Sequence, residues 1–164
     1  MKTGVIKEFR GEYYFLSNFY TAPFVWRGIE FASGEHAFSY AKTNFLTTNP
    51  EPVRLRNNIL KASTPGEAKK FGRMVPLDVK AWDAHKVQYM REIVHAKFKA
   101  PGMVGPLLNT GSCMLVEGND WGDKFWGRCL DKSTGKMVGL NTLGVILMEE
   151  RGYWLYSDFK DKNA

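Results

Sequence analysis

The pattern of apolar and polar positions along the 164-residue chain predicts several helices and a few short strands. The strongest helical signal begins at Asp78, a good N-cap, and runs to about Phe98. Its apolar residues recur three and four positions apart: Trp82, Tyr89, Met90, Ile93, Val94 and Phe98. The Pro-Gly pair at 101–102 ends this helix, and Leu107-Leu108 indicates a brief further turn.

Capping residues predict the other helices. Ser33 is a suitable N-cap for a helix from Gly34 to about Phe45. The Asn-Pro-Glu-Pro sequence at 49–52 breaks the chain before a polar helix at 53–61. A further short helix opens at 63–67 and leads to Arg73.

The last helix begins near Asn141 or Thr142, since either residue can cap it. We expect it to turn three apolar residues inward: Leu143, Ile146 and Leu147.

The strands are short. Pro23–Trp26 and Ile29–Phe31, joined by Arg27-Gly28, have the pattern of a hairpin. The apolar run 113–116 predicts a buried strand, and Trp126–Leu130 can pair as another. The chain shows no repeat or linker, so we expect a single domain over residues 1–164. Its class is α+β, mostly helical, with a few short strands.

Composition supports an ordinary globular protein, with 44% hydrophobic and 24% charged residues. This excludes a disordered chain, a collagen and a coiled coil. No apolar run approaches the roughly 18 residues of a membrane helix, and the N-terminus lacks the apolar segment of an export signal. We therefore expect a cytoplasmic protein with no membrane partner. Cys113 and Cys129 lack zinc-site spacing, so we expect reduced thiols in the core and no metal.

Charge and aromatic content point toward anionic partners. Lys and Arg total 23 against 17 acidic residues, a net charge of +6, and 14% of residues are aromatic. A nucleotide, a phosphosugar and a nucleic acid all suit this charge. On charge alone, a soluble basic domain with solvated lysines is the commoner explanation.

The predicted helix at 34–45 carries the first candidate site. Glu35 and Lys42 are two turns apart, about 10.5 Å along one helix face, with Phe38 between them. The carboxyl can act as a general acid or base, and a desolvated amine can attack a sugar carbon. The alternative is a solvated Glu and Lys beside a core Phe. His36 lies off this face and suits a packing or capping role.

The segment 118–127 carries the second candidate, with two carboxylates, two indoles and three glycines. Rings such as Trp121 and Trp126 can stack on a base, while Asp120, beside the flexible Gly122, can bind ribose hydroxyls. The glycine pattern fits neither a dinucleotide fold nor a phosphate loop. The alternative is a tight turn whose tryptophans fold onto the core.

Two isolated residues complete the candidates. Asn18, inside the aromatic stretch 13–20, can hydrogen-bond a base or ribose, or satisfy a backbone bend. Arg73, nine residues before Trp82, can hold a phosphate with two hydrogen bonds, or form a surface ion pair.

Five sequence blocks in this order resemble the NADAR (YbiA-like) family. They span residues 13–151 and are YYFLSNFY, FASGEHAFSYAK, FGRMVPLDVKAW with MREIVHAKF, LVEGNDWGDKFWG, and GLNTLGVILMEER. The resemblance implies a compact, largely helical fold and an N-glycosidase acting on ribosyl compounds. One family branch hydrolyses early riboflavin intermediates that carry a ribosylamine phosphate. Another branch removes ADP-ribose from guanine bases in nucleic acid.

The resemblance also assigns roles to residues. Glu35 and Lys42 match the motif Glu and Lys, and the Lys is implicated as a nucleophile that forms a Schiff base with ribose C1 in the guanine branch. With Asp120 of the acidic-aromatic loop, they form the expected catalytic set. Gly34 departs from the family's usual Ser-Glu-His motif. The expected substrate-binding residues are Asn18, Phe38, Arg73, Trp82, Trp121, Gly122 and Trp126.

Together these observations predict an N-glycosidase that needs no metal or other cofactor. Its substrate is a small nucleotide or phosphosugar, or an ADP-ribosylated nucleic acid. The net charge favours ADP-ribose on guanine over the riboflavin intermediates. Two non-enzymatic alternatives remain: a module that binds NAD or ADP-ribose, and a single-strand nucleic-acid binder. Neither of these needs both Glu35 and Lys42 on one helix face.

Overall fold

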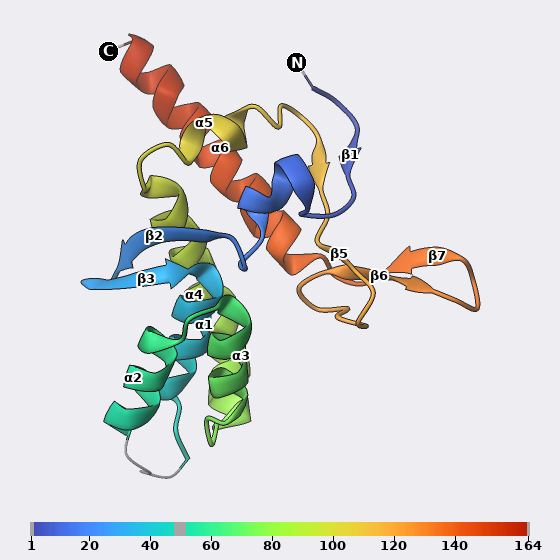
Figure 1. The fold of residues 1–164 in the computed structure, drawn as a ribbon. Helices are drawn as coiled ribbons and strands as arrows, with labels where there is room; N and C mark the ends of the chain where they lie inside the picture. Colours follow the sequence, from blue (N-terminus) through green and yellow to red (C-terminus); the bar gives the residue numbers. More distant parts are fainter. Residues whose placement is uncertain (1, 48–51, 164) are drawn as a thin grey trace. The chain divides into compact units, whose positions relative to one another are not determined.

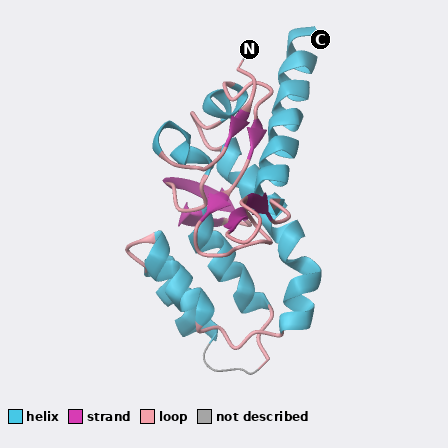
Figure 2. Ribbon diagram, turned by 90° about the vertical axis from the view of Figure 1, so that its right-hand side faces the viewer, coloured by secondary structure: helices cyan, strands magenta, loops and turns pink. Residues whose placement is uncertain are grey.

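The computed structural model describes residues 2–47 and 52–163. Helices predominate over short strands (Figures 1 and 2), so the predicted α+β, mostly helical class is confirmed. The chain forms two compact units, one made of residues 18–100 and the other of the segments on either side. The assignment of residues 1–164 to a single domain stays a prediction.

The central unit begins with the predicted hairpin, in which β2 (Thr21–Trp26) pairs antiparallel with β3 (Ile29–Ser33). Both residues of its two-residue turn have positive φ, +50° at Arg27 and +78° at Gly28. Such turns suit the right-handed twist of the flanking strands. Glycine adopts this backbone readily, whereas an arginine does so only when other contacts hold it.

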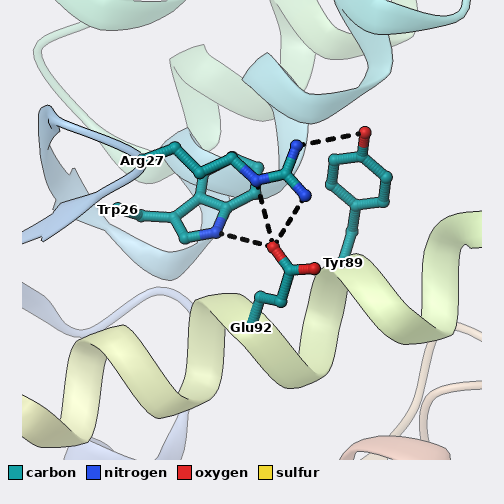
Figure 3. Close-up of polar contacts among 4 residues, drawn as sticks. All are labelled: Trp26, Arg27, Tyr89 and Glu92. Carbon is teal, nitrogen blue, oxygen red and sulfur yellow. Dashed lines mark hydrogen bonds and ion pairs between the residues drawn. The ribbon is translucent and has the colours of Figure 1, made fainter.

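Contacts with α4 (Val79–Lys99) hold Arg27 in that conformation. Its guanidinium donates to Glu92 Oε2 at 3.0 and 2.8 Å and to the Tyr89 hydroxyl at 3.4 Å (Figure 3). It also lies over the rings of Trp26 and Tyr89, 5.0 and 4.7 Å from their centres. Trp26 Nε1 donates to the same Glu92 oxygen at 3.2 Å. One carboxylate thus fastens the hairpin tip to α4.

The helices of the central unit begin where the capping residues predicted. Ser33 accepts the His36 N–H at the start of α1 (Gly34–Ala41), and Asp78 accepts the Ala81 N–H at the start of α4. The α-helical part of α1 is shorter than predicted. A 3-10 turn, η2 (Lys42–Asn44), continues it, and there the Thr43 hydroxyl donates to the Tyr40 carbonyl.

Two short helices complete this unit, α2 (Pro52–Lys61) and α3 (Pro65–Arg73). Thr64 caps α3 by accepting the Glu67 N–H. Both helices match the prediction, while residues 49–51 of the predicted break lie outside the described residues. In the same unit α1 packs against α2, α3 and α4, and α4 runs along β2 (Figure 1).

His36 explains how α1 is held among its neighbours. The ring is 2% exposed, with Nε2 3.0 Å from the Ala62 carbonyl and Nδ1 2.7 Å from Ser33 Oγ. A carbonyl only accepts, so Nε2 carries the proton and donates it to Ala62. The packing and capping role predicted for His36 is confirmed.

The flanking unit contains short strands in two sheets. Its elements are β1 (Val5–Ile6), η1 (Gly11–Leu16), α5 (Val104–Leu108), β4 (Met114–Leu115), β5 (Gly118–Asn119), β6 (Arg128–Asp131), β7 (Lys136–Val138) and α6 (Thr142–Asn163). Strands β1 and β4 pair in parallel, and β6 lies between parallel β5 and antiparallel β7. The turn predicted at Leu107-Leu108 is the end of α5.

Two predicted strands in this unit are shorter or shifted. The buried strand expected at 113–116 is regular only at β4, although the Val116 N–H still donates to the Ile6 carbonyl. The strand expected from Trp126 begins two residues later, at β6. The backbone of Trp126 makes hydrogen bonds outside the sheet: its N–H donates to Asp123 Oδ1, and its carbonyl accepts the Leu143 N–H.

Asn141 fixes the start of α6, although not through the predicted side-chain cap. Its side chain accepts the Glu117 N–H and donates to the Leu115 carbonyl, both at 2.9 Å, and its φ is +57°. Three α6 residues are buried as predicted, namely Leu143, Ile146 and Leu147. Cys113 and Cys129 are free and buried. None of the described helices is both long and apolar enough to cross a membrane.

Candidate active site

Glu35 is a carboxyl enclosed in the protein. It lies in the first turn of α1 with 7% of its surface exposed. The Glu35 N–H donates to the Asn18 carbonyl at 2.9 Å, and the Ser39 hydroxyl donates to Glu35 Oε1 at 3.2 Å. These contacts fix both ends of the residue, so its carboxyl has a defined position.

Burial sets the protonation of this carboxyl. Loss of hydration raises the pKa of Glu35 above its ordinary value, because the charged form loses more solvation than the neutral form. The cations of Lys69, Lys42 and Arg73 and the Ser39 hydroxyl oppose this shift without cancelling it. The environment therefore favours a protonated Glu35 over a wider pH range than for a solvent-exposed carboxyl.

Lys42 follows α1 directly, as the first residue of η2, and the pKa of its amine shifts in the opposite direction. Its Nζ lies 5.7 Å from the centre of the Phe38 ring. Burial lowers the pKa of Lys42, and the positive charges of Lys69 and Arg73 lower it further, while Glu35 partly opposes them. A larger share of the amine is then neutral near physiological pH, which is the form that attacks carbon.

The aromatic residues next to this pair are packed together. Trp82 is 5% exposed and Phe38 8%, and their ring centres are 5.0 Å apart. Phe45 and Tyr89 cover other sides of Trp82, at 5.6 and 6.1 Å. Trp82 thus supports the Phe38 side of the site, and its direct contact with a substrate stays a prediction.

Asn18 supports the start of α1. Its carbonyl accepts the Glu35 N–H, and its side-chain Nδ2 lies 3.4 Å from Met90 Sδ. A Cβ on Gly34 would lie 2.7 Å from Asn18 Oδ1. Glycine at position 34 therefore leaves room for the Asn18 side chain beside Glu35. The carbonyl that accepts the Glu35 N–H belongs to the main chain, so both roles predicted for the Asn18 side chain, binding a base or ribose and satisfying a backbone bend, stay predictions.

Helix α3 contributes cations to the same buried carboxyl. Arg73, its last residue, is solvent-exposed, and Lys69 lies one turn earlier. Lys69 Nζ lies 5.4 Å from the centre of the Phe19 ring. Lys69 was not among the residues predicted from the sequence, although its i,i+4 spacing from Arg73 was a signal that could have identified it.

The loop 118–127 belongs to the other unit. The buried side chain of Asn119 donates to the Asp123 and Arg128 carbonyls and accepts the Asp123 N–H. Asp123 Oδ1 in turn accepts the Phe125 and Trp126 N–H groups. The loop is therefore anchored at both ends, with the tip 120–122 between the anchors.

The residues at this tip are exposed. Trp121 is 59% exposed, so it does not fold onto the core as the alternative held, and Gly122 has a φ of +85°. Asp120 is also exposed, while Trp126 is partly buried. An exposed indole on an anchored loop has a free face for a planar ligand.

The structure thus divides the ten predicted residues between the two units. The central unit holds Asn18, Glu35, Phe38, Lys42, Arg73 and Trp82, and the flanking unit holds Asp120, Trp121, Gly122 and Trp126. Lys69, Ser39 and Asn119 were missed. Within residues 2–47 and 52–163, no group of three or more His, Cys, Asp or Glu side chains is placed to hold a metal ion.

The chemistry available to Glu35 and Lys42 follows from the opposite shifts of their pKa values. A carboxyl kept protonated by burial can donate a proton to a leaving group, and a partly neutral amine can act as a nucleophile. Neighbouring titratable groups whose pKa values are shifted in opposite directions are typical of acid–base catalytic sites.

Comparison with known proteins gives consistent matches. The model of the NADAR domain matches residues 6–153. N-glycosidase YbiA of Escherichia coli strain K12 is 36% identical over 138 residues, which cover 82% of this chain and 78% of that protein. N-glycosidase Npun_R5314 of Nostoc punctiforme is 41% identical over 92 residues, 55% of each chain. The NMR structure of E. coli YbiA has a TM-score of 0.74 and 30% identity, covering 96% of this chain and 88% of that one.

Proposed function

This chain belongs to the NADAR domain family, and we propose that it is a metal-independent N-glycosidase that hydrolyses the C–N bond between a ribosyl group and a base. The observation that carries the proposal is the placement of Glu35 on α1 and of Lys42 on the 3-10 turn that continues it, with burial shifting the pKa values of the two side chains in opposite directions. The N-glycosidase names of the relatives support the reaction class.

The first step breaks the glycosidic bond. Positive charge grows at ribose C1 while negative charge grows on the leaving base. The protonated Glu35 carboxyl gives its proton to the base nitrogen as the C1–N bond breaks. The neutral Lys42 amine forms a new bond to C1, and the proton it then loses returns to the Glu35 carboxylate.

The second step releases the sugar. The Lys42 adduct opens to an imine as the ring oxygen takes a proton from the amine nitrogen. Water adds to the imine carbon, the C–N bond to Lys42 breaks, and the ribosyl product leaves with a free anomeric carbon. Lys42 returns to its amine form, so one water is consumed for each bond cleaved.

The substrate we favour is ADP-ribose attached to guanine or a related ADP-ribose conjugate. The net charge of +6 attracts a polyanion, and an ADP-ribosylated nucleic acid is the more highly charged of the candidate substrates. A ribosylaminopyrimidine phosphate of early riboflavin synthesis is the second candidate, because it is also an anionic N-riboside.

A product assay by mass spectrometry tests this function. It compares a guanine-ADP-ribosylated oligonucleotide with the ribosylaminouracil phosphate, each incubated with wild type, Glu35→Gln and Lys42→Ala. We expect free ADP-ribose from the wild type and a loss of at least 100-fold in both variants. Cleavage of the pyrimidine phosphate alone would move the substrate to the second candidate. If the protein binds ADP-ribose but turns over neither compound, it is a non-catalytic binding module and not an enzyme.

A further inference from the structure

We propose that Lys69 and Arg73 of α3, with the Phe19 ring beside Lys69, form a clamp for a phosphate group attached to the ribosyl part of the substrate. Lys69 and Phe19 are new site residues, and Arg73 gains a partner. The inference rests on the proposed function for the identity of the sugar, although binding of the phosphate can be measured without turnover.

The packing of α3 on α1 brings the clamp to Glu35. Gly72 is buried, and a Cβ added to it would lie 2.6 Å from Ser39 Oγ and 2.7 Å from Ser39 Cβ. The Ser39 hydroxyl is the group that donates to Glu35. Residues 69, 72 and 73 share one face of a helix, at i, i+3 and i+4. Lys69 and Arg73 therefore flank the point at which α3 contacts the Glu35 environment.

The cations on this face lack counter-ions. In the described part of the chain, neither Lys69 nor Arg73 makes an ion pair with an acidic side chain. Both act on Glu35 and on Lys42 through space. With Lys42 they place three basic groups near a single buried carboxyl. Like charges gathered without partners destabilise a folded protein, and a bound anion removes this cost.

A phosphate on the ribosyl group fits the excess of charge. The monoester of a ribosylaminopyrimidine phosphate carries about −1.5 to −2 charges near pH 7, and the diphosphate of ADP-ribose places two anionic phosphates next to the same ribose. Either one offsets the two cations of α3. Lys69 and Arg73 are about 6 Å apart along the helix axis, so both long side chains can reach one phosphate. Arg73 supplies a two-pronged donor, and Lys69 supplies a point charge. The Phe19 ring restricts the Lys69 side chain to one side through a cation–π contact.

Isothermal titration calorimetry with ribose 5-phosphate, unphosphorylated ribose and inorganic phosphate tests the clamp. We expect the wild type to prefer ribose 5-phosphate to ribose by at least tenfold. Lys69→Gln and Arg73→Gln should each lower the affinity for ribose 5-phosphate about tenfold or more and leave the affinity for ribose unchanged. Lys69→Arg, which keeps the charge, should retain most of the affinity. Lys70→Gln is the matched control, since Lys70 is the exposed neighbour on the same helix.

The outcomes separate this inference from the proposed function. Equal affinity of the wild type for ribose and ribose 5-phosphate, or unchanged affinity in folded Lys69→Gln and Arg73→Gln, would overturn the clamp. The same holds if Lys70→Gln weakens binding as much as they do. Tighter binding of inorganic phosphate than of ribose 5-phosphate would show a free anion site and would also overturn it. If the Lys69→Gln and Arg73→Gln variants lose binding of ribose 5-phosphate but the wild type cleaves no N-riboside, the phosphate clamp is supported and the proposed glycosidase activity is refuted.

Discussion

Replacing Gly72 with alanine tests whether close packing of α1 and α3 positions the candidate active site. The added Cβ would lie 2.6 Å from Ser39 Oγ and 2.7 Å from Ser39 Cβ, in a place where both residues are buried. Rotating the Ser39 side chain cannot remove a contact with its Cβ. The two helices must therefore separate, and the Ser39 hydroxyl must shift relative to Glu35.

The size of the effect follows from two opposing contributions. Overpacking a buried contact costs about 1–3 kcal/mol, and a 2.7 Å approach to Ser39 Cβ that no side-chain rotation relieves places this contact in the upper part of that range, at about 2–3 kcal/mol. The better helix propensity of alanine returns about 1 kcal/mol. We therefore expect Gly72→Ala to lower the free energy of unfolding by about 1–2 kcal/mol, with a fall in Tm of about 2–8 °C. Turnover should fall by about tenfold or more, because small displacements of catalytic groups are costly.

Urea unfolding and initial rates measure both effects on the same preparation. Gly66→Ala is the matched control in the same helix, since its Cβ would meet only Thr64 Oγ1, at 3.9 Å. We expect this variant to be at least as stable as the wild type, with a gain of up to about 1 kcal/mol from helix propensity, and to be equally active. If Gly72→Ala unfolds at the same urea concentration as the wild type and has the same turnover, the contact does not position the site.

Three further predictions test other parts of the structure. His36→Ala should lower the free energy of unfolding by about 2–4 kcal/mol, because it leaves a cavity and an Ala62 carbonyl without its donor; a loss below about 1 kcal/mol in urea unfolding would contradict this. Asn141→Ala should cost about 2–4 kcal/mol, since it removes the bonds to Glu117 and Leu115 and strains a positive φ; wild-type stability in the same assay would refute the argument. Burial raises the pKa of Glu35, so between its unfolded and folded pKa values the folded protein binds more protons, and stability falls as pH rises through that window. Glu35→Gln should flatten that part of the stability–pH curve, and an unchanged slope would show that the buried carboxyl is not its source.

Local chemistry made much of the fold predictable from the sequence. Ser33 and Asp78 cap helices with their own side chains, which accept the N–H of the residue three positions later. Such features depend only on residues three or four positions away. For the same reason the α1 motif was visible, because Glu35 and Lys42 are related by helical spacing alone.

Features that depend on distant residues were not predictable. Strand β1 pairs with β4 more than a hundred residues later, and each strand is only two residues long. Asn141 has the chemistry of a cap, yet its side chain satisfies the backbone of 115–117. Lys69 comes within electrostatic reach of Glu35 because α3 packs on α1 at Gly72. The sequence pattern of a short polar helix does not show which other helix it packs against.

The most direct test of the central claim is chemical trapping of the Lys42 imine. The wild type and Glu35→Gln are incubated with each candidate substrate and sodium borohydride, digested, and examined by peptide mass spectrometry; Lys42→Ala is the control. The account predicts a reduced ribosyl adduct on the Lys42 peptide of the wild type, much less in Glu35→Gln, and none at position 42 in Lys42→Ala. Efficient turnover with no adduct on Lys42, or with an adduct only on another lysine, would contradict it.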